Sequence, residues 1–370
     1  MTLLIIVVAV LCLAYANGAN DNFKGVATLF GSGTTNYQGA LRWATVATFL
    51  GSLTAVLLAE QLLKNFSGRG LIPDALVADP RYVAAVALGA GLTVLLATRV
   101  GMPVSTTHGL VGALVGAGLA AGAHASFGKL QSDFFLPLLT SPLIAVAATC
   151  ICYPIFTGLR RAAGISHETC FCVGAQVVET VPAMGRVAAM QRVEQLTVTV
   201  GSQVCCKNRY RGRVLWLDAA TVLDRMHFLS AGVVSFARGL NDTPKIAALL
   251  LLAPHLGAFG GLSIVAVIIA AGGLISARRV AETMSGKITP MNHGQGFTAN
   301  LITGVIAIAA SNLGMPVSTT HVSCGALFGI GAVTRQGNYR TILKILGAWV
   351  TTLPAGAALG AASYWLLQAV

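Results

Sequence analysis

Charged side chains are scarce in this chain: only 10% of its 370 residues are Asp, Glu, Lys or Arg, whereas 55% are hydrophobic. A soluble domain carries roughly 25% charged residues. Several stretches of about 18 to 25 residues are almost free of charge, which is the length that a bilayer-spanning helix needs. The scarcity of charge argues against a soluble enzyme and predicts an all-α polytopic membrane protein.

Two further features are missing. No extended run of Arg and Lys alternates with exposed aromatic residues, so a nucleic-acid surface has little support although the net charge is +12. No Gly-x-Ser-x-Gly nucleophile elbow occurs, which leaves little support for a membrane-embedded hydrolase using Ser105 or Ser318 with a histidine. We therefore expect neither an enzyme nor a nucleic-acid partner, but a protein whose partner is the lipid bilayer.

The apolar stretches divide into two sets of five. They lie near 3–31, 40–63, 82–98, 102–122 and 134–159, and again near 227–253, 259–277, 296–312, 314–333 and 342–369. An odd number of crossings makes the second half enter the bilayer from the opposite side. We expect two inverted-topology repeats of about five transmembrane segments, over 1–160 and 226–370, as in many secondary transporters. The stretches 82–122 and 296–333 fit either full crossings or re-entrant hairpins at the midplane.

A polar segment, 161–225, joins the two halves. From Arg160 to Arg225 there are nine basic and five acidic residues. Because Lys and Arg collect in cytoplasmic loops, this insert is expected in the cytoplasm. The protein would lie in the cell membrane with both termini on its outer side. Polar and apolar residues alternate loosely over Val193–Val204, which predicts a small β-containing insert.

One phrase of eight residues occurs twice without change. Gly-Met-Pro-Val-Ser-Thr-Thr-His fills 101–108 and again 314–321. Proline suits the first turn of a helix, where backbone N–H groups are free and the helix dipole is positive, so the following hydroxyls are expected to bind a small tetrahedral anion. The predicted substrate ligands are Ser105, Thr106, Thr107, Ser318, Thr319 and Thr320. The alternative is that these hydroxyls bond only to backbone carbonyls or to neighbouring helices.

A second pattern, Ala-x-Gly-x-Asn-Asp-x-x-Lys, also occurs twice, at 16–24 and 237–245. An Asp near the bilayer centre costs about 2.5–3.5 kcal/mol, so such residues are usually paired and functional. Glycine and Asn-Asp are expected to break both helices, with Pro244 starting the second half-helix. Oxygen atoms there would suit a hard cation such as sodium. The predicted cation ligands are Asn20, Asp21, Asn241 and Asp242.

Several residues beside these motifs are expected to support the site. Asp21–Lys24 and Asp242–Lys245 have the spacing of internal ion pairs, an alternative compatible with cation binding. Asn17 is replaced by Arg238 in the second copy, so the site cannot be fully symmetric. The remaining supporting candidates are His108, His321 and Lys245. The pairs Gly112/Gly116 and Gly325/Gly329 predict close helix packing.

The insert also carries cysteines that raise the question of a metal. A zinc site is one interpretation of His167, Cys170, Cys172, Cys205 and Cys206. Their spacings differ from the usual Cys-x-x-Cys knuckles, so reduced cysteines without a metal are the preferred interpretation. No cofactor is expected.

These two repeated motifs resemble the inorganic phosphate transporter (PiT) family. The resemblance rests on Gly18-Ala19-Asn20-Asp21, on Phe236 to Lys245 and on both Gly-Met-Pro-Val-Ser-Thr-Thr-His phrases, and it covers about 1–160 and 225–370. It implies inverted repeats, a central site for inorganic phosphate, coupling to sodium ions or protons, and often a homodimer. It also implies that Asn20, Asp21, Asn241 and Asp242 serve cations and substrate. A sulfate symporter of the same fold and a passive anion channel remain alternatives.

Overall fold

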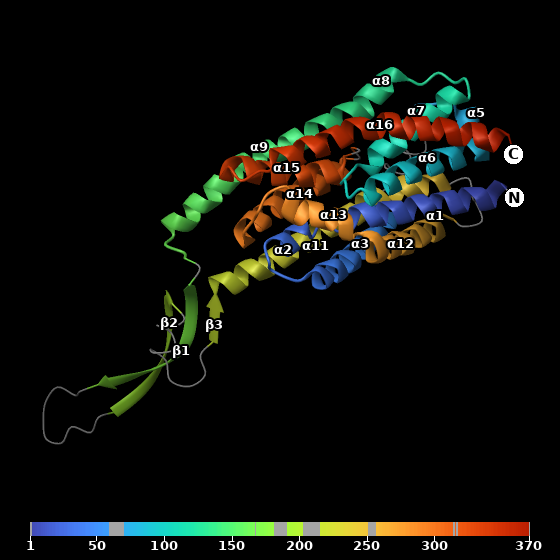
Figure 1. Ribbon diagram of the computed structural model, residues 1–370. Coiled ribbons are helices and arrows are strands. Elements are labelled where there is room, and N and C mark those ends of the chain that lie inside the picture. The colour runs from blue at the N-terminus through green and yellow to red at the C-terminus, as the bar shows by residue number, and fades with distance from the viewer. Residues whose placement is uncertain are drawn as a thin grey trace, which may run out of the picture. The chain divides into compact units, whose positions relative to one another are not determined.

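The computed structural model describes residues 2–58, 70–166, 168–180, 191–202, 215–250, 257–313, 315 and 317–369. The chain forms two compact units, one of Met1–Tyr153 with His227–Val370 and one of Pro154–Met226. The first unit is helical, and the second contains a small antiparallel sheet (Figure 1).

The helices follow the apolar stretches of the sequence closely. The first half comprises α1 (Thr2–Asp21), α2 (Ala27–Gly31), α3 (Tyr37–Leu58), α5 (Asp74–Val77), α6 (Pro80–Arg99), α7 (Thr106–Ala120), α8 (Phe127–Lys129), a π-helical turn (Leu130–Phe135) and α9 (Leu136–Ala162). The second half comprises α11 (Ala219–Ala247), a 3-10 turn (Ala248–Leu250), α12 (Gly257–Ser276), α13 (Arg278–Glu282), a π-helical turn (Thr283–Lys287), α14 (His293–Asn312), α15 (Thr319–Thr334) and α16 (Tyr339–Gln368).

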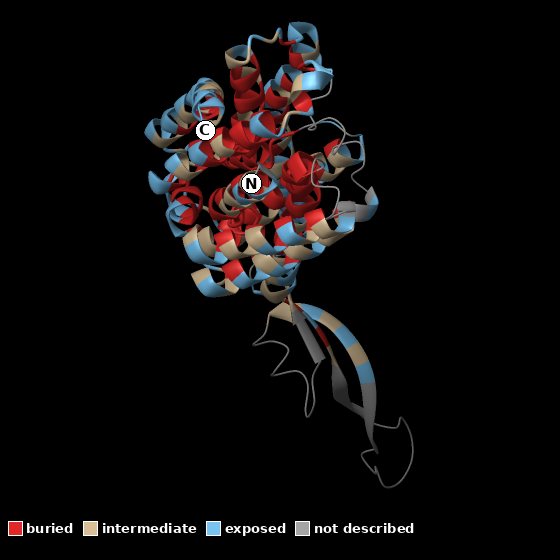
Figure 2. Cartoon of the chain, turned by 90° about the vertical axis from the view of Figure 1, so that its right-hand side faces the viewer, coloured by how far each residue is buried: buried red, intermediate tan, exposed pale blue. Residues whose placement is uncertain are grey.

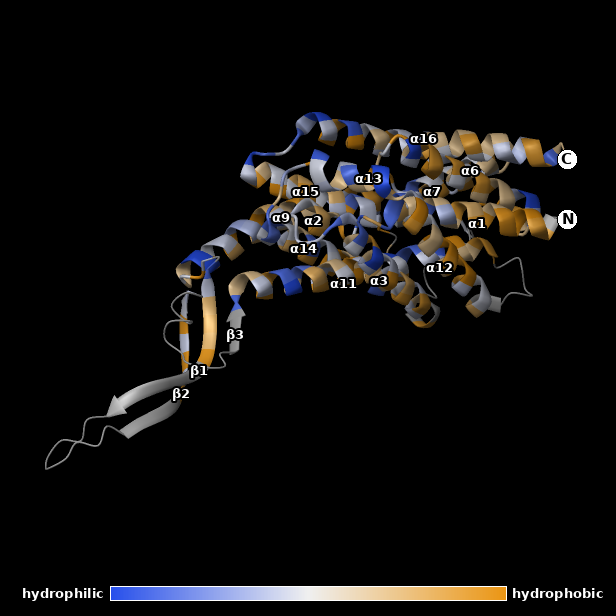
Figure 3. Cartoon of the chain, turned by 60° about the horizontal axis from the view of Figure 1, so that its bottom comes forward, coloured by the Kyte–Doolittle hydropathy of each residue, from blue (hydrophilic) through white to orange (hydrophobic). Residues whose placement is uncertain are grey.

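The helical unit has the surface of a protein embedded in lipid. Within the described residues, five helical segments are long and apolar enough to cross a membrane: Leu3–Asp21, Pro80–Arg99, Phe127–Ala162, Phe259–Ser276 and Tyr339–Gln368. Large apolar side chains are exposed on these and other helices, and hydrophobic residues run along most of their length (Figure 3). The prediction of an integral membrane protein is confirmed. Ten crossings and an inverted second half stay predictions.

Small residues bring the helices close together around a buried centre (Figure 2). Helix α1 packs against α6 and α12, and α16 packs along α7 and α6. A Cβ atom added at Gly116 of α7 would lie 2.0 Å from the carbonyl oxygen of Ala357 in α16, and one at Gly329 would lie 2.7 Å from Cβ of Thr149. The repeated glycine spacings therefore mark close packing, as predicted.

The two Asn-Asp motifs differ in backbone structure. Helix α1 ends at Asp21, and turns lead to α2 at Ala27, so the first predicted break is present. The predicted break in the second helix was wrong, because α11 continues through Asn241 and Asp242 to Ala247 with Pro244 inside it. The polar side chains of this copy find partners on neighbouring segments without the backbone leaving the helix: Asn241 bonds to Val317, for example.

The insert is a three-stranded antiparallel sheet in the order β2-β1-β3. Its strands are β1 (Thr169–Thr180), β2 (Gln191–Ser202) and β3 (Leu215–Asp218). Cys170 and Cys172 of β1 are buried, while Phe171 between them is exposed and pairs in register with Val200 of β2. The prediction of a small β-containing insert is confirmed, and β1 and β3 extend it beyond the alternating stretch seen in the sequence.

Candidate functional site

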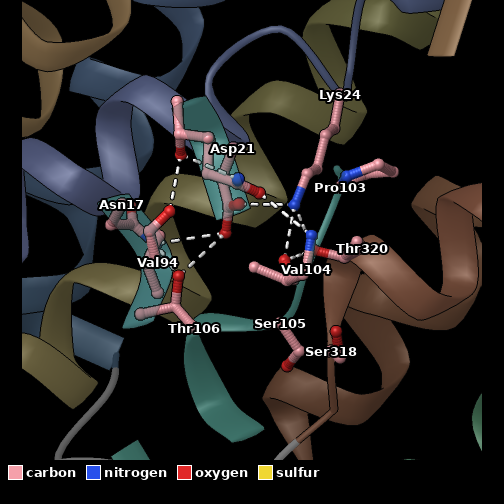
Figure 4. Close-up of polar contacts among 12 residues, drawn as sticks. Asn17, Asp21, Lys24, Val94, Pro103, Val104, Ser105, Thr106, Ser318 and Thr320 are labelled. Atoms are coloured by element: carbon pink, nitrogen blue, oxygen red, sulfur yellow. Dashed lines mark hydrogen bonds and ion pairs between the residues drawn. The ribbon is translucent and has the colours of Figure 1, made fainter. Parts of the chain in front are cut away.

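The two copies of the eight-residue phrase meet at the starts of α7 and α15. Ser105 and Ser318 are the N-cap residues, and their hydroxyls accept hydrogen bonds of 3.2 Å from the backbone N–H groups of His108 and His321. The two imidazole rings lie edge to face with centroids 4.5 Å apart. Figure 4 shows both serines at these adjoining helix starts. Two positively polarised helix ends therefore converge on one region.

The asparagines of the Asn-Asp motifs hold the segments that precede these helices. Asn20 donates to the carbonyl of Met102 at 3.0 Å and accepts from the N–H of Val104 at 3.1 Å. Asn241 donates to the carbonyl of Val317, the repeat equivalent of Val104, at 3.1 Å. Among the described residues, the buried side-chain oxygen of Asn241 has no hydrogen-bond partner. The structure thus places both asparagines against the backbone of the phrase.

Lys24 connects the first Asn-Asp motif to the second copy of the phrase (Figure 4). Its ammonium group is 2.5 Å from the carboxylate of Asp21, with which it forms a buried ion pair. It also donates to the carbonyl of Val104 at 2.8 Å and to the hydroxyl of Thr320 at 2.5 Å. Lys24, in the turn after α1, therefore joins the last residue of α1, the linker of its own half and the helix start of the other half.

Lys245 repeats this arrangement from the second half. Its ammonium group lies 3.4 Å from the carboxylate of Asp242. It donates to the carbonyl of Val317 at 3.0 Å and to the hydroxyl of Thr107 at 3.1 Å. Thr107 belongs to the first half, so each lysine reaches across to the opposite helix start. Both ion pairs that the sequence spacing indicated are present.

Asn17 and Arg238 occupy the centre between the two carboxylates. The Asn17 amide nitrogen lies 3.2 Å from Asp21, 3.4 Å from Asp242 and 3.0 Å from the Thr106 hydroxyl. Arg238 donates to the Asn17 side-chain oxygen at 2.6 Å and approaches the Asp242 carboxylate at 3.6 Å. The residues that break the symmetry of the sequence repeat therefore bond directly to each other.

The charged residues of the site are all nearly inaccessible, none being more than 5% exposed: Asp21, Lys24, Arg238, Asp242 and Lys245. Two carboxylates face three basic groups, which leaves one net positive charge. Burying charges is unfavourable unless they are paired and hydrogen-bonded, and each of these groups has such contacts. A desolvated cluster with one excess positive charge, beside two helix N-termini, is suited to bind an anion.

The structure brings together the residues that the sequence singled out from both halves. The polar contacts described above join Asn17, Asn20, Asp21, Lys24, Ser105, Thr106, Thr107, His108, Arg238, Asn241, Asp242, Lys245, Ser318, Thr320 and His321. Thr319 begins α15 beside them and is buried.

Sequence reasoning missed two residues that contact the site, Asn22 and Trp349. Arg238 donates to Asn22 at 3.2 Å, and the Trp349 indole donates to the Pro103 carbonyl at 3.1 Å. Nothing in the sequence around Trp349 marks it as close to the phrase.

The zinc interpretation of the insert gains no support. His167, Cys205 and Cys206 lie outside the described residues, and the residues that are described hold no cluster of three metal-ligating side chains. Burial raises the pKa of the Cys170 thiol, and the Asp218 carboxylate raises it further, which disfavours the thiolate that zinc requires. Cys172 forms a disulfide, so the expectation of reduced cysteines was wrong at this position.

The comparisons with known proteins match nearly the whole chain, and they agree with one another. The profile of the phosphate transporter family matches residues 17–360. A Rhizobium meliloti protein named "Probable low-affinity inorganic phosphate transporter" is 30% identical, over 96% of this chain and 93% of its own length. "Inorganic phosphate transporter 2-1, chloroplastic" of Arabidopsis thaliana is 26% identical, over 97% of this chain and 71% of its own. The solved structure of "The sodium-dependent phosphate transporter" has the same fold, with a TM-score of 0.76, 20% identity and coverage of 100% and 99%.

Proposed function

The chain belongs to the phosphate transporter family, and we propose that it imports inorganic phosphate across the cell membrane as a secondary active transporter. A sodium or proton gradient drives uptake, and the site is exposed to each side in turn by alternating access. One observation carries this proposal: the helix starts at Ser105 and Ser318 adjoin a buried cluster with one net positive charge. Members of this family are transporters and permeases rather than enzymes.

Phosphate binds, in this proposal, between the starts of α7 and α15. Hydroxyls and first-turn N–H groups from both copies of the phrase donate to its oxygens, from Ser105, Thr106, Thr107, Ser318, Thr319 and Thr320. Asn20 and Asn241 position the two linkers, as their contacts with Met102 and Val317 indicate. Asp21 and Asp242 couple binding to the cation, and Arg238 supplies the excess positive charge.

Two inverted repeats explain why each lysine contacts a threonine of the opposite half. Lys24 and Thr320 in one direction, and Lys245 and Thr107 in the other, are the pairing expected when two equivalent halves face each other. The 15 residues of α7 span about 22 Å, less than the roughly 30 Å of bilayer hydrocarbon, whereas α6 before it is long enough to cross. We propose repeats at 1–160 and 226–370 that assemble as a homodimer, with the cytoplasmic insert at 161–225 and the termini outside.

The membrane potential opposes phosphate entry, so uptake must be coupled to the entry of cations. Moving a phosphate dianion into a cell with a negative interior costs about 4.6 kcal/mol per 100 mV, at about 2.3 kcal/mol per charge. Uptake against this potential therefore needs at least two cations per dianion. The two Asn-Asp motifs, related by the repeat, supply two carboxylates for this purpose.

Sulfate is the competing substrate, since it has the same tetrahedral shape. At neutral pH phosphate still carries a proton that it can donate to a carboxylate, whereas sulfate carries none. The Asn17 amide nitrogen lies within 3.4 Å of both the Asp21 and the Asp242 carboxylate, so a phosphate bound near them would be stabilised by donating a hydrogen bond to a carboxylate. Unlabelled phosphate should therefore displace labelled phosphate at lower concentration than sulfate does; the opposite order would favour a sulfate carrier.

Uptake of labelled phosphate into proteoliposomes tests the proposal. We expect saturable uptake driven by an imposed sodium or proton gradient, which a passive channel would not need. Asp21→Asn and Asp242→Asn should abolish gradient-driven uptake. Glu282→Gln is the matched control, because the Glu282 side chain is 50% exposed and pairs only with exposed Arg278 in the described contacts. Wild-type rates in both aspartate variants would refute the assigned roles.

A further inference from the structure

We propose that the ammonium groups of Lys24 and Lys245 are fixed cations of the binding site, which hold the oxygen atoms that a co-transported sodium ion would need. Phosphate binding is then independent of sodium, and of the two coupling ions considered above the proton drives uptake. This inference rests on the proposed function and narrows the coupling ion from sodium or proton to the proton.

The oxygens around Lys24 are those that a hard cation selects. They are one carboxylate oxygen of Asp21, the backbone carbonyl of Val104 and the hydroxyl of Thr320, at 2.5 to 2.8 Å from the nitrogen. An ammonium group has three N–H donors, and these three acceptors match that number. Carboxylate and carbonyl oxygens are also typical ligands of metal cations. One set of oxygens cannot serve both a lysine and a sodium ion.

The second half repeats the same choice of ligands. Lys245 contacts one carboxylate oxygen of Asp242, the carbonyl of Val317 and the hydroxyl of Thr107, at 3.0 to 3.4 Å. Val317 and Thr107 are the repeat equivalents of Val104 and Thr320. The arrangement therefore occurs at both carboxylates, from residues far apart in the chain, and is a property of the site rather than of one loop.

The net charge of the site leads to the same conclusion. Lys24, Lys245 and Arg238 exceed the two aspartates by one positive charge, and all five side chains are buried. A sodium ion at each carboxylate would raise the excess to three positive charges in a region of low dielectric, where like charges repel strongly. A single phosphate monoanion neutralises the cluster without any added cation. The monoanion carries one proton more than the dianion, so one further proton per phosphate balances its charge.

Two measurements on the wild-type full-length protein test the inference. The first is labelled phosphate uptake into proteoliposomes under an inward proton gradient, with sodium replaced on both sides by potassium or choline. The second is thermal stability in detergent with and without sodium chloride at constant ionic strength. We expect uptake within about twofold of the rate in sodium and no sodium-specific rise in melting temperature. Loss of uptake without sodium, or a specific stabilisation by sodium, would overturn the inference.

Removing a lysine should create a need for sodium. Lys24→Ala leaves the oxygens of Asp21, Val104 and Thr320 without the ammonium group, so uptake should fail in sodium-free buffer and return when sodium is added. Sodium should also raise the melting temperature of this variant. Lys344→Ala, at an exposed lysine of α16, is the control and should behave as wild type.

Lys245→Ala provides the same test in the other half, in case one variant does not fold. A lysine variant that folds but gains no response to sodium would contradict the role of that lysine. Failure of the wild type to transport phosphate under any gradient would instead refute the proposed function. The thermal measurement on the wild type would still decide whether sodium binds.

Discussion

The imidazole of His108 lies edge to face with the imidazole of His321, with ring centroids 4.5 Å apart. The two residues are equivalent positions of a phrase repeated 213 residues later in the chain. His321 also contacts the ring of Trp349 at 3.9 Å between centroids, and the Trp349 indole donates to the carbonyl of Pro103. These rings contact the linker before α7 through the Trp349 indole, so a residue outside both motifs helps to position them.

Trp349→Phe should weaken phosphate binding while the protein remains folded. The substitution keeps an aromatic ring but leaves the Pro103 carbonyl without its indole donor, and one such hydrogen bond contributes about 0.5–1.5 kcal/mol. We expect KM for phosphate to rise about two- to tenfold with little change in the maximal rate. Trp365→Phe is the control, since Trp365 lies on the same helix and is 63% exposed. An unchanged KM in Trp349→Phe would show that the linker is positioned without this bond.

Arg238→Met should lower phosphate affinity more strongly. It removes the excess positive charge of the site and leaves the side-chain oxygen of Asn17 without its 2.6 Å donor. A buried hydrogen bond to a charged group contributes about 1.5–3 kcal/mol, so an affinity loss of roughly 10- to 100-fold is expected in binding titrations with phosphate.

Arg278→Met is the matched control for that measurement, because Arg278 is a solvent-facing arginine whose side chain is 79% exposed. It should leave the affinity unchanged. An Arg238→Met protein that binds phosphate as tightly as wild type would mean that the excess charge at the site does not attract the substrate.

Gly116→Ala should destabilise the helical unit. The added methyl group would meet the Ala357 backbone oxygen at 2.0 Å, and α7 and α16 would have to separate. Such overpacking costs about 1–3 kcal/mol, which a lowered melting temperature in detergent would report. Gly347→Ala on α16 is the control, because its added Cβ would meet no described atom within 4 Å. Equal melting temperatures for the two variants would contradict this close packing.

The orientation of the insert can be measured directly. A protease added to inside-out membrane vesicles should cleave between residues 161 and 225, and the same protease outside intact spheroplasts should not. The reason is the excess of basic over acidic residues between Arg160 and Arg225. Cleavage only from the outer face would invert the proposed topology and place both termini in the cytoplasm.

The sequence alone predicted the class of protein and most of the candidate site. Long apolar runs indicated membrane helices because charge is unfavourable in lipid, and the exactly repeated phrase together with the repeated Asn-Asp pattern indicated two related halves. The same motifs supplied the family resemblance that the family profile confirmed. Capping by Ser105 and Ser318 also follows from local chemistry, since serine before a helix accepts from its free N–H groups.

Other features depended on contacts between distant segments. The local pattern at 241–244 predicted a helix break, yet α11 is continuous there, because Asn241 and Thr243 find partners at Val317 and Ser52. The pairing of Lys24 with Thr320 joins residues 296 positions apart. Sequence spacing shows which residues share a helix, but it does not show which lysine meets which hydroxyl. That choice is made when the two halves pack together and bury their charges, since each buried ammonium group must then find acceptors nearby.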